Sequence, residues 1–332
     1  MAVNSEETAG QVSEPSEDVQ ATQEEVRSAF WSAVERGSTR LDRHWLGLLA
    51  TGSAGGLDMA IGAFGLLVVL QSTRSLVLAS LTFSIGFIVV VFADSELFTE
   101  NFLVPIAAVA TRRGSVSSLL RLWGATLVTN LAAGWLLAGL LVMGFPQIRQ
   151  PAQQLSSFYL SQGVGWRSFS AAVIAGMLVT LMTWMNSITT KQATRLFSAL
   201  VVGYLLGLGQ MPHCIASGIE MFIALIGGAP FGYRTAFPII AWMVLGNLVG
   251  GVLVASGVRL AQVGGIELRR QQHESAARGE QRDDWEGRDS GHQEVAEVDV
   301  DHLDAPRRHR IFQAIKRNAS PSQQSLDDQG SN

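Results

Sequence analysis

The sequence predicts an all-α membrane protein with six transmembrane helices in two inverted three-helix repeats. Between His44 and Val258 the chain is mostly Leu, Val, Ala, Gly and Ile. A membrane-crossing helix needs about 20 mostly apolar residues. Six stretches meet this length, near 45–70, 77–111, 117–143, 168–186, 195–226 and 237–258. The second and fifth are too long for one straight crossing, and polar residues interrupt each of them near its middle.

The segment before the first span, 1–43, is predicted to be cytoplasmic. Residues 1–21 are acidic and polar, which favours disorder and provides no basic-then-apolar signal pattern. From 22 to 40, apolar residues recur at helical spacing between charges: Val26, Ala29, Phe30, Ala33 and Val34. This pattern predicts an amphipathic helix, lying either on the cytoplasmic membrane face or against the protein itself.

The two interruptions indicate broken helices. The first covers 94–101 (DSELFTEN) and the second 209–214 (GQMPHC). In the second, Pro212 cannot donate a backbone hydrogen bond and disfavours helix at Met211. Lipid cannot satisfy non-helical backbone, so such backbone must line a cavity or pack against protein. Broken helices at matching positions of two repeats point to a transport site at the membrane midplane.

A short motif supports the repeat. Asn130 begins NLAAG in the third span, and Asn247 begins NLVGG in the sixth, at similar distances from the preceding interruptions. Three spans followed by three spans have opposite topologies. The halves are therefore predicted to be related by a two-fold axis in the membrane plane.

His213 is the one histidine well inside the predicted membrane region. An imidazole there needs hydrogen-bond partners, and its unperturbed pKa of about 6.5 suits proton transfer near neutral pH. It is either a pore group or a buried residue that fixes the loop, and its coincidence with the interruption favours the pore. Ser217, four residues later, shares its helical face if a part-helix begins near Cys214.

The first interruption contains large apolar and acidic residues. Leu97 and Phe98 either form a hydrophobic constriction or pack in the core, and Thr99 supplies a small hydroxyl. The carboxylates are predicted to cap the adjoining part-helices: Asp94, Glu96 and Glu100. Two further acidic residues within apolar spans, Asp58 and Glu220, are expected to form structural pairs.

Basic residues set the predicted orientation. Arg36, Arg40 and Arg43 precede the first span, and Arg112 and Arg113 follow the second. This bias favours a multi-pass protein of the plasma or inner membrane with both termini in the cytoplasm. The tail, 263–332, is densely charged and predicted to be disordered and cytoplasmic.

Several classes of protein are not expected. The chain has 24 basic and 28 acidic residues, and the net charge of −4 suggests no nucleic-acid partner. It contains no Cys/His cluster with metal spacing, no phosphate-binding glycine loop and no Gly-x-Ser-x-Gly motif. We therefore expect no enzyme activity, no cofactor and no metal site.

Three motifs together resemble the formate/nitrite transporter family: ELFT at 96–99, PHCIAS at 212–217 and GNLVGG at 246–251. The resemblance covers roughly 25–260. It implies an aquaporin-like protomer assembled as a homopentamer in the lipid bilayer, with one pore in each protomer. It also implies that Leu97 and Phe98 line a constriction, that Thr99 lies on a flexible loop and that His213 is the central pore histidine. The implied substrates are small monovalent anions such as formate, nitrite, hydrosulfide or lactate, often carried with a proton.

Two positions depart from the family pattern. After its histidine the family commonly reads SIAN, whereas this chain reads CIAS at 214–217. The family often places an Asn two turns before a Trp, and counting back from Trp184 reaches Gly176. These departures place the chain nearer to a poorly characterised branch than to the formate channels.

The predicted mechanism is proton-assisted anion passage. A bare anion at an apolar constriction is severely desolvated, so a weak acid would take a proton near His213, pass Leu97 or Phe98 and reionise beyond. One alternative is a neutral-solute pore of the same architecture, with pH-independent flux. Another is a scaffold or sensor that acts through the cytoplasmic tail and loses its output without 266–332.

Overall fold

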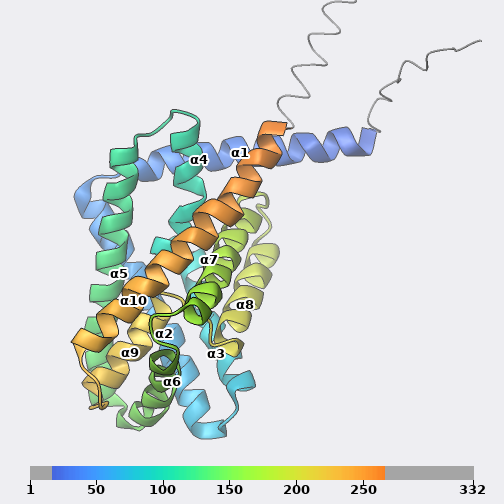
Figure 1. The fold of residues 1–332 in the computed structure, drawn as a ribbon. Coiled ribbons are helices and arrows are strands. Elements are labelled where there is room, and N and C mark those ends of the chain that lie inside the picture. Colours follow the sequence, from blue (N-terminus) through green and yellow to red (C-terminus); the bar gives the residue numbers. More distant parts are fainter. Residues whose placement is uncertain (1–16, 266–332) are drawn as a thin grey trace, which may run out of the picture. The chain divides into compact units, whose positions relative to one another are not determined.

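The computed structural model describes residues 17–265, so the predictions for 1–16 and for the tail from 266 lie outside the described residues. All regular elements in the described range are helical (Figure 1), which confirms the all-helical fold class. In chain order they are α1 (Glu17–Leu41), α2 (Trp45–Thr73), α3 (Leu76–Ala93), η1 (Phe98–Phe102), α4 (Val104–Ala110), α5 (Val116–Gly144), η2 (Pro146–Ile148), α6 (Arg149–Gln162), α7 (Trp166–Ser187), α8 (Gln192–Leu208), α9 (Ala216–Ile226), α10 (Tyr233–Leu248) and the π-helical η3 (Val249–Ser256).

Within residues 17–265, five helices are long and apolar enough to cross a membrane. They are Trp45–Thr73, Leu76–Ala93, Val116–Gly144, Trp166–Ser187 and Tyr233–Gly265, the last continuing α10 through η3. The predicted span near 195–226 corresponds to two shorter apolar helices, α8 and α9. The end of the predicted span 77–111 corresponds to a further short segment, Phe98–Ala110.

Local sequence explains where several helices begin and end. Ser75 precedes α3 and its hydroxyl accepts a hydrogen bond from Leu78 N at 3.3 Å, and Ser115 does the same before α5 with Ser118 N at 3.0 Å. These are serine N-caps. Asp94 ends α3 in the left-handed conformation, with φ of 52°. The prediction that Asp94 caps a helix N-terminus is therefore wrong, because it lies at a C-terminus.

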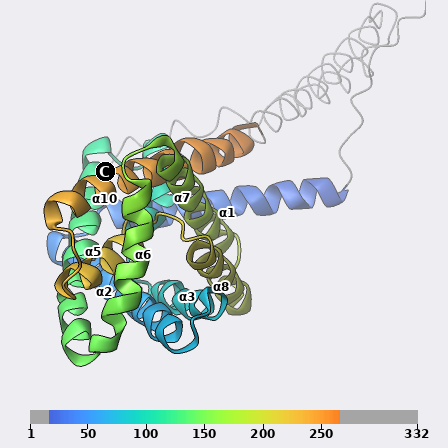
Figure 2. The ribbon, with the colours of Figure 1, turned by 60° about the horizontal axis from the view of Figure 1, so that its bottom comes forward.

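The helix α6 was not expected from the sequence, which has no long apolar run there. It buries one face only, through Pro151, Ala152, Leu155, Ser156 and Tyr159. It packs mainly against α9. Figure 1 places α6 at the end opposite α1, and Figure 2 brings that end forward. The helix is thus a surface element outside the candidate membrane spans.

The amphipathic helix α1 packs on the protein itself. Phe30 and Val34 on its apolar face lie in one cluster with Leu103, Ala107 and Trp184. Since Ala107 belongs to α4 and Trp184 to α7, α1 covers the ends of these two helices (Figure 1).

Two glycines permit close contacts between helices at the two asparagines. A Cβ atom on Gly56 of α2 would collide with the backbone of Asn130 in α5. A Cβ atom on Gly176 of α7 would collide in the same way with the backbone of Asn247 in α10. Small residues allow such close approach where no hydrophobic force drives membrane helices together. Gly176, which departs from the family pattern, therefore has a packing role.

We predict that Gly56→Ala and Gly176→Ala each destabilise the fold by about 1–3 kcal/mol, because the added methyl group forces the paired backbones apart. Thermal unfolding of the purified protein in detergent measures the effect. Gly124→Ala is the matched control, because a Cβ atom there meets nothing within 4 Å. Equal melting temperatures for all three variants would contradict the close-packing role.

Candidate functional site: a pair of loops around His213

Asn130 holds the first non-helical loop. Its side-chain Oδ1 accepts a hydrogen bond from Phe98 N at 2.8 Å. Its Nδ2 donates to Glu96 O at 2.9 Å and to Gly52 O of α2 at 2.6 Å. One buried amide therefore satisfies two loop groups and ties the loop to α2, as buried backbone requires.

Asn247 holds the second loop with the same geometry. Its Oδ1 accepts from Cys214 N at 2.8 Å. Its Nδ2 donates to Pro212 O at 2.9 Å and to Ala172 O of α7 at 2.8 Å. In both loops the donor and acceptor that the amide engages lie two residues apart. The sequence motif that suggested a repeat thus has a defined structural task at both places.

His213 and Thr99 bring the two loops together. The ring Nε2 of His213 lies 2.8 Å from Thr99 Oγ1, and both side chains are buried. The backbone N–H of His213 donates to Ser217 Oγ at 3.2 Å. Residues 114 positions apart therefore form one buried polar centre.

The hydrogen bonds of His213 define its neutral tautomer. Nδ1 accepts from the backbone N–H of Ala216 at 3.2 Å, so that nitrogen carries a lone pair. The proton of the neutral ring is then on Nε2, which donates to Thr99 Oγ1. Thr99 accepts in this bond, and its own hydroxyl hydrogen is available for another acceptor.

The aromatic residues near the two loops form two separate clusters, one around His213 and one around Phe98. Phe87 of α3 meets the His213 ring edge to face, with centroids 5.7 Å apart, and Phe83 meets Phe87 at 5.8 Å. Phe98 instead contacts Phe102 at 5.0 Å and Trp123 at 6.5 Å. Phe87, which sequence reasoning did not select, is therefore the described aromatic neighbour of His213.

On the α6 side, Ser217 and Glu220 extend the polar centre. The Tyr159 hydroxyl donates to Glu220 Oε2 at 2.9 Å and also interacts with the Ser217 side chain. Burial, and then the neighbouring Glu220 carboxylate, raises the pKa of Tyr159 well above its usual value, so the phenol remains a donor. The predicted structural pairing of Glu220 has Tyr159 as its partner.

On the α1 side, arginines approach the first loop. Glu96 pairs with Arg43, whose Nη1 lies 2.8 Å from Oε1, and with Arg40, whose Nε lies 3.6 Å from the same oxygen. Arg40 Nη1 also donates to Asn101 Oδ1 at 3.1 Å. Glu96 thus serves as an ion-pair partner, and the prediction that it caps a part-helix is wrong.

The other two acidic positions have different surroundings. Glu100 lies buried within η1, and Leu103, which makes no side-chain cap bond, is the residue that precedes α4. The expected cap by Glu100 is therefore absent from the described residues. Asp58 accepts a hydrogen bond from the Ser95 hydroxyl at 2.5 Å, which is the structural pairing expected for it.

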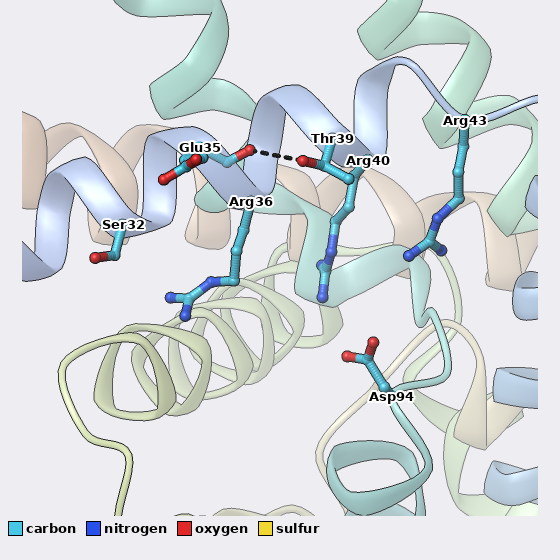
Figure 3. A pocket seen from close by; sticks show the side chains of 7 residues that line it. All are labelled: Ser32, Glu35, Arg36, Thr39, Arg40, Arg43 and Asp94. Atoms are coloured by element: carbon cyan, nitrogen blue, oxygen red, sulfur yellow. Dashed lines mark hydrogen bonds between the residues drawn. The ribbon is translucent and has the colours of Figure 1, made fainter.

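Two neighbouring cavities open beneath α1. Figure 3 shows Arg36 and Arg40 on α1 and Arg43 on the segment after it, and these residues line, together with Asp94, a cavity of about 450 Å³. A second cavity of about 320 Å³ is lined by Arg36, Arg40, Arg195, Asp94 and Glu100 among others. Burial, and then the positive charges of Arg40 and Arg195, lowers the pKa of Arg36. Several guanidinium groups therefore converge at this end.

The sequence carried a signal for these arginines. Their spacing of four residues places Arg36 and Arg40 on one face of α1, and Arg43 follows three residues later, just after the helix ends. Sequence reasoning used them only to orient the chain. Tyr159 lay in a segment without an expected element, so no comparable signal identified it.

Comparison with known proteins identifies the family. The formate/nitrite transporter profile matches residues 27–261. The inner membrane protein YfdC of Escherichia coli (strain K12) is 25% identical over 239 residues, which cover 68% of this chain and 75% of YfdC. Formate-nitrite transporter 3 of Toxoplasma gondii is 26% identical over 249 residues, which cover 70% of this chain and 49% of that longer protein. A solved FNT family ion channel superposes with a TM-score of 0.62 at 18% identity, covering 72% of this chain and 98% of the channel.

The arrangement is that of a helical membrane protein with paired central loops. The profile match spans most of the described range, and the chain belongs to the formate/nitrite transporter family. The resemblance drawn from the ELFT, PHCIAS and GNLVGG motifs is thereby confirmed. The solved channel adds that the fold is shared.

We predict that Asn247→Leu destabilises the protein by about 1–3 kcal/mol, because Cys214 N and Pro212 O lose a buried partner. Thermal unfolding in detergent measures the loss. Asn186→Leu is the control, since Asn186 is half-buried and its described side-chain bond is with Ser198 alone. If both variants melt together with the parent, Asn247 does not hold the loop.

Proposed function

We propose that this protein is a membrane channel or transporter, rather than an enzyme, and that it carries small monovalent anions such as formate or nitrite with the assistance of a proton. The observation that carries the proposal is the buried His213–Thr99 pair, which joins η1 to the loop before α9 through a contact of 2.8 Å. Family membership supports the transport class, and the names of its relatives motivate the choice of anion.

The proposal includes six spans in two inverted repeats. In this arrangement α3 with η1 and α4 forms the second span, and α8 with α9 forms the fifth. The equivalent amide geometries of Asn130 and Asn247 support it. Two contacts between the proposed halves also support this arrangement. A Cβ atom on Gly134 would meet Ile219, and one on Gly251 would meet Phe102. In each case a glycine four residues after the asparagine faces the opposite half.

The transport domain is proposed to cover 44–262, with 1–43 and the tail from 263 in the cytoplasm. The arginines on α1 and at the start of α8 line the same cavity, which supports one basic end. An excess of basic residues marks the cytoplasmic side of membrane proteins.

The proposed path passes an apolar constriction beside His213. Phe87 contacts the histidine ring, and Leu97 and Phe98 directly precede Thr99 in the chain. A bare anion would lose its hydration there, and protonation removes most of that cost. The Thr99 hydroxyl donates to the substrate while accepting from Nε2, and Ser217 contributes a second hydroxyl.

The basic end gives the proposed pore its selectivity for anions. Arg36, Arg40 and Arg195 line one cavity, where their charge raises the local anion concentration. A pore for neutral solutes would not need several guanidinium groups around one cavity. Flux that does not depend on pH would favour the neutral-solute alternative.

The proposed assembly is a homopentamer, which rests on the family resemblance. We predict that native mass spectrometry in mild detergent reports a five-fold multiple of the 35.7 kDa chain. Lipid that stays bound to the protein in the same spectra shows that the conditions are gentle enough to preserve the assembly. Monomers or dimers alone under those conditions would contradict the pentamer.

We predict that His213→Asn flattens the pH profile of formate uptake. Asn keeps an amide donor for Thr99 but cannot be protonated. Loss of a charge-assisted hydrogen bond is worth about 1.5–3 kcal/mol, so uptake at acidic pH falls by about 10- to 100-fold. Proteoliposome uptake across a pH range measures this. His44→Asn, at an exposed position, is the matched control. Parental pH dependence in the His213 variant would overturn the proton-assisted role.

A further inference from the structure

A polar stripe runs along α9 from the histidine toward the α6 end. Ser217 and Glu220 are three residues apart in α9 (Ala216–Ile226), so they share one helical face, and His213 lies in the loop just before this helix. Ser217 is 2% exposed and Glu220 is 3% exposed. The rest of α9 is mostly apolar, which makes a buried carboxyl group on this face unusual.

Tyr159 connects the stripe to α6. Its hydroxyl donates to Glu220 Oε2 at 2.9 Å and also interacts with the Ser217 side chain. Ser217 Oγ in turn accepts from the backbone N–H of His213. A continuous set of hydrogen-bonding groups therefore leads from the α6 end to the histidine.

Glu220 has no described cation beside it. Helices α6, α5, α10 and α2 pack against α9. Their charged residues are Arg149, Arg121, Arg234 and Asp58 respectively. None of these four forms a described ion pair with Glu220, and Asp58 is bonded to Ser95. The one titratable group recorded against the Glu220 carboxyl is the Tyr159 phenol.

This arrangement suits a carboxyl group that carries a proton. A buried carboxylate without a cation is strongly disfavoured, whereas a neutral, hydrogen-bonded carboxylic acid is tolerated. An ionised carboxylate on this face would also repel an anion moving along it. The two ends therefore differ: guanidinium groups gather under α1, and a carboxyl group lies at the α6 side of the histidine.

We propose that Glu220 is the proton-loading group of the pore on its α6 side, with Tyr159 as its positioning residue. This inference rests on the proposed function, because it names the source of the proton that accompanies the anion. In the step, the protonated Glu220 carboxyl group transfers its proton to the substrate anion, which gives the neutral acid and a Glu220 carboxylate. The carboxylate then regains a proton from water at the α6 end. No electrons are transferred, and one proton moves with each anion.

The test uses full-length protein in proteoliposomes, with radiolabelled formate and a pH-sensitive dye inside. We expect Glu220→Gln to lower proton-coupled formate uptake at acidic pH at least tenfold and to remove its pH dependence. Tyr159→Phe removes one hydrogen bond from the carboxyl group and is expected to move the pH midpoint of uptake. The control is Ser157→Ala, which removes an exposed α6 hydroxyl bonded to Gln153 O in its own helix.

A second measurement does not depend on transport. Infrared difference spectra of the wild type should contain the carbonyl band of a protonated carboxyl group at neutral pH. The band should be lost in Glu220→Gln and shifted in Tyr159→Phe. If Glu220→Gln does not fold, the test rests on Tyr159→Phe alone. A carbonyl band and a pH midpoint of uptake that are both the same as in the wild type would then overturn the inference.

The outcomes separate this inference from the proposed function. Wild-type uptake with an unaltered pH profile in Glu220→Gln overturns the role of Glu220 and leaves anion transport in place. A wild type that carries neither formate nor nitrite at any pH overturns the proposed function and this inference together.

Discussion

The structure depends on two buried amides that hold non-helical backbone inside a helical membrane protein. A loop in this setting has free N–H and C=O groups that lipid cannot satisfy. Asn130 and Asn247 each satisfy one N–H and one C=O group of a loop and fasten it to a neighbouring helix. The amides reach their targets because Gly56 and Gly176 let the paired backbones approach. Loop position, and with it the contact between Thr99 and His213, follows from this packing.

The surface helices give the two ends of the protein different chemistry. Helix α1 brings Arg40 to the first loop, and the connection after α1 brings Arg43, and both arginines pair with Glu96. Helix α6 brings a neutral phenol, Tyr159, to the carboxyl group of Glu220. Helix α1 is followed by α2, and α6 by α7, within a few residues. The protein thus carries basic groups at the α1 end and a hydrogen-bonded acid toward the α6 end.

Sequence reasoning succeeded where the determinants are local. Apolar runs indicated the five long apolar helices of the described residues, and Pro212 with His213 marked the break between α8 and α9, because hydropathy and proline geometry act within a few residues. It failed where a distant residue decides the outcome. Glu96 was assigned to a cap, but Arg43, from the connection between α1 and α2, forms an ion pair with it. Tyr159 was missed because its helix is held by tertiary packing on α9 rather than by an apolar run. The partners of Asn130 and Asn247 likewise lie 32 to 78 residues away.

The hydrogen bonds of His213 explain why a separate proton-holding group would be useful. Nδ1 accepts from Ala216 N, and Nε2 faces Thr99 Oγ1. A second proton on the ring would have to occupy Nδ1, where the Ala216 N–H already points, so charging the ring requires that bond to break. In the described geometry the histidine is a fixed donor that polarises the Thr99 hydroxyl. A proton held on a carboxyl group at the α6 side would reach the anion without disturbing the helix start at Ala216. Under the proposed mechanism, His213 orients the substrate through the Thr99 hydroxyl, and a second group supplies the proton that neutralises it.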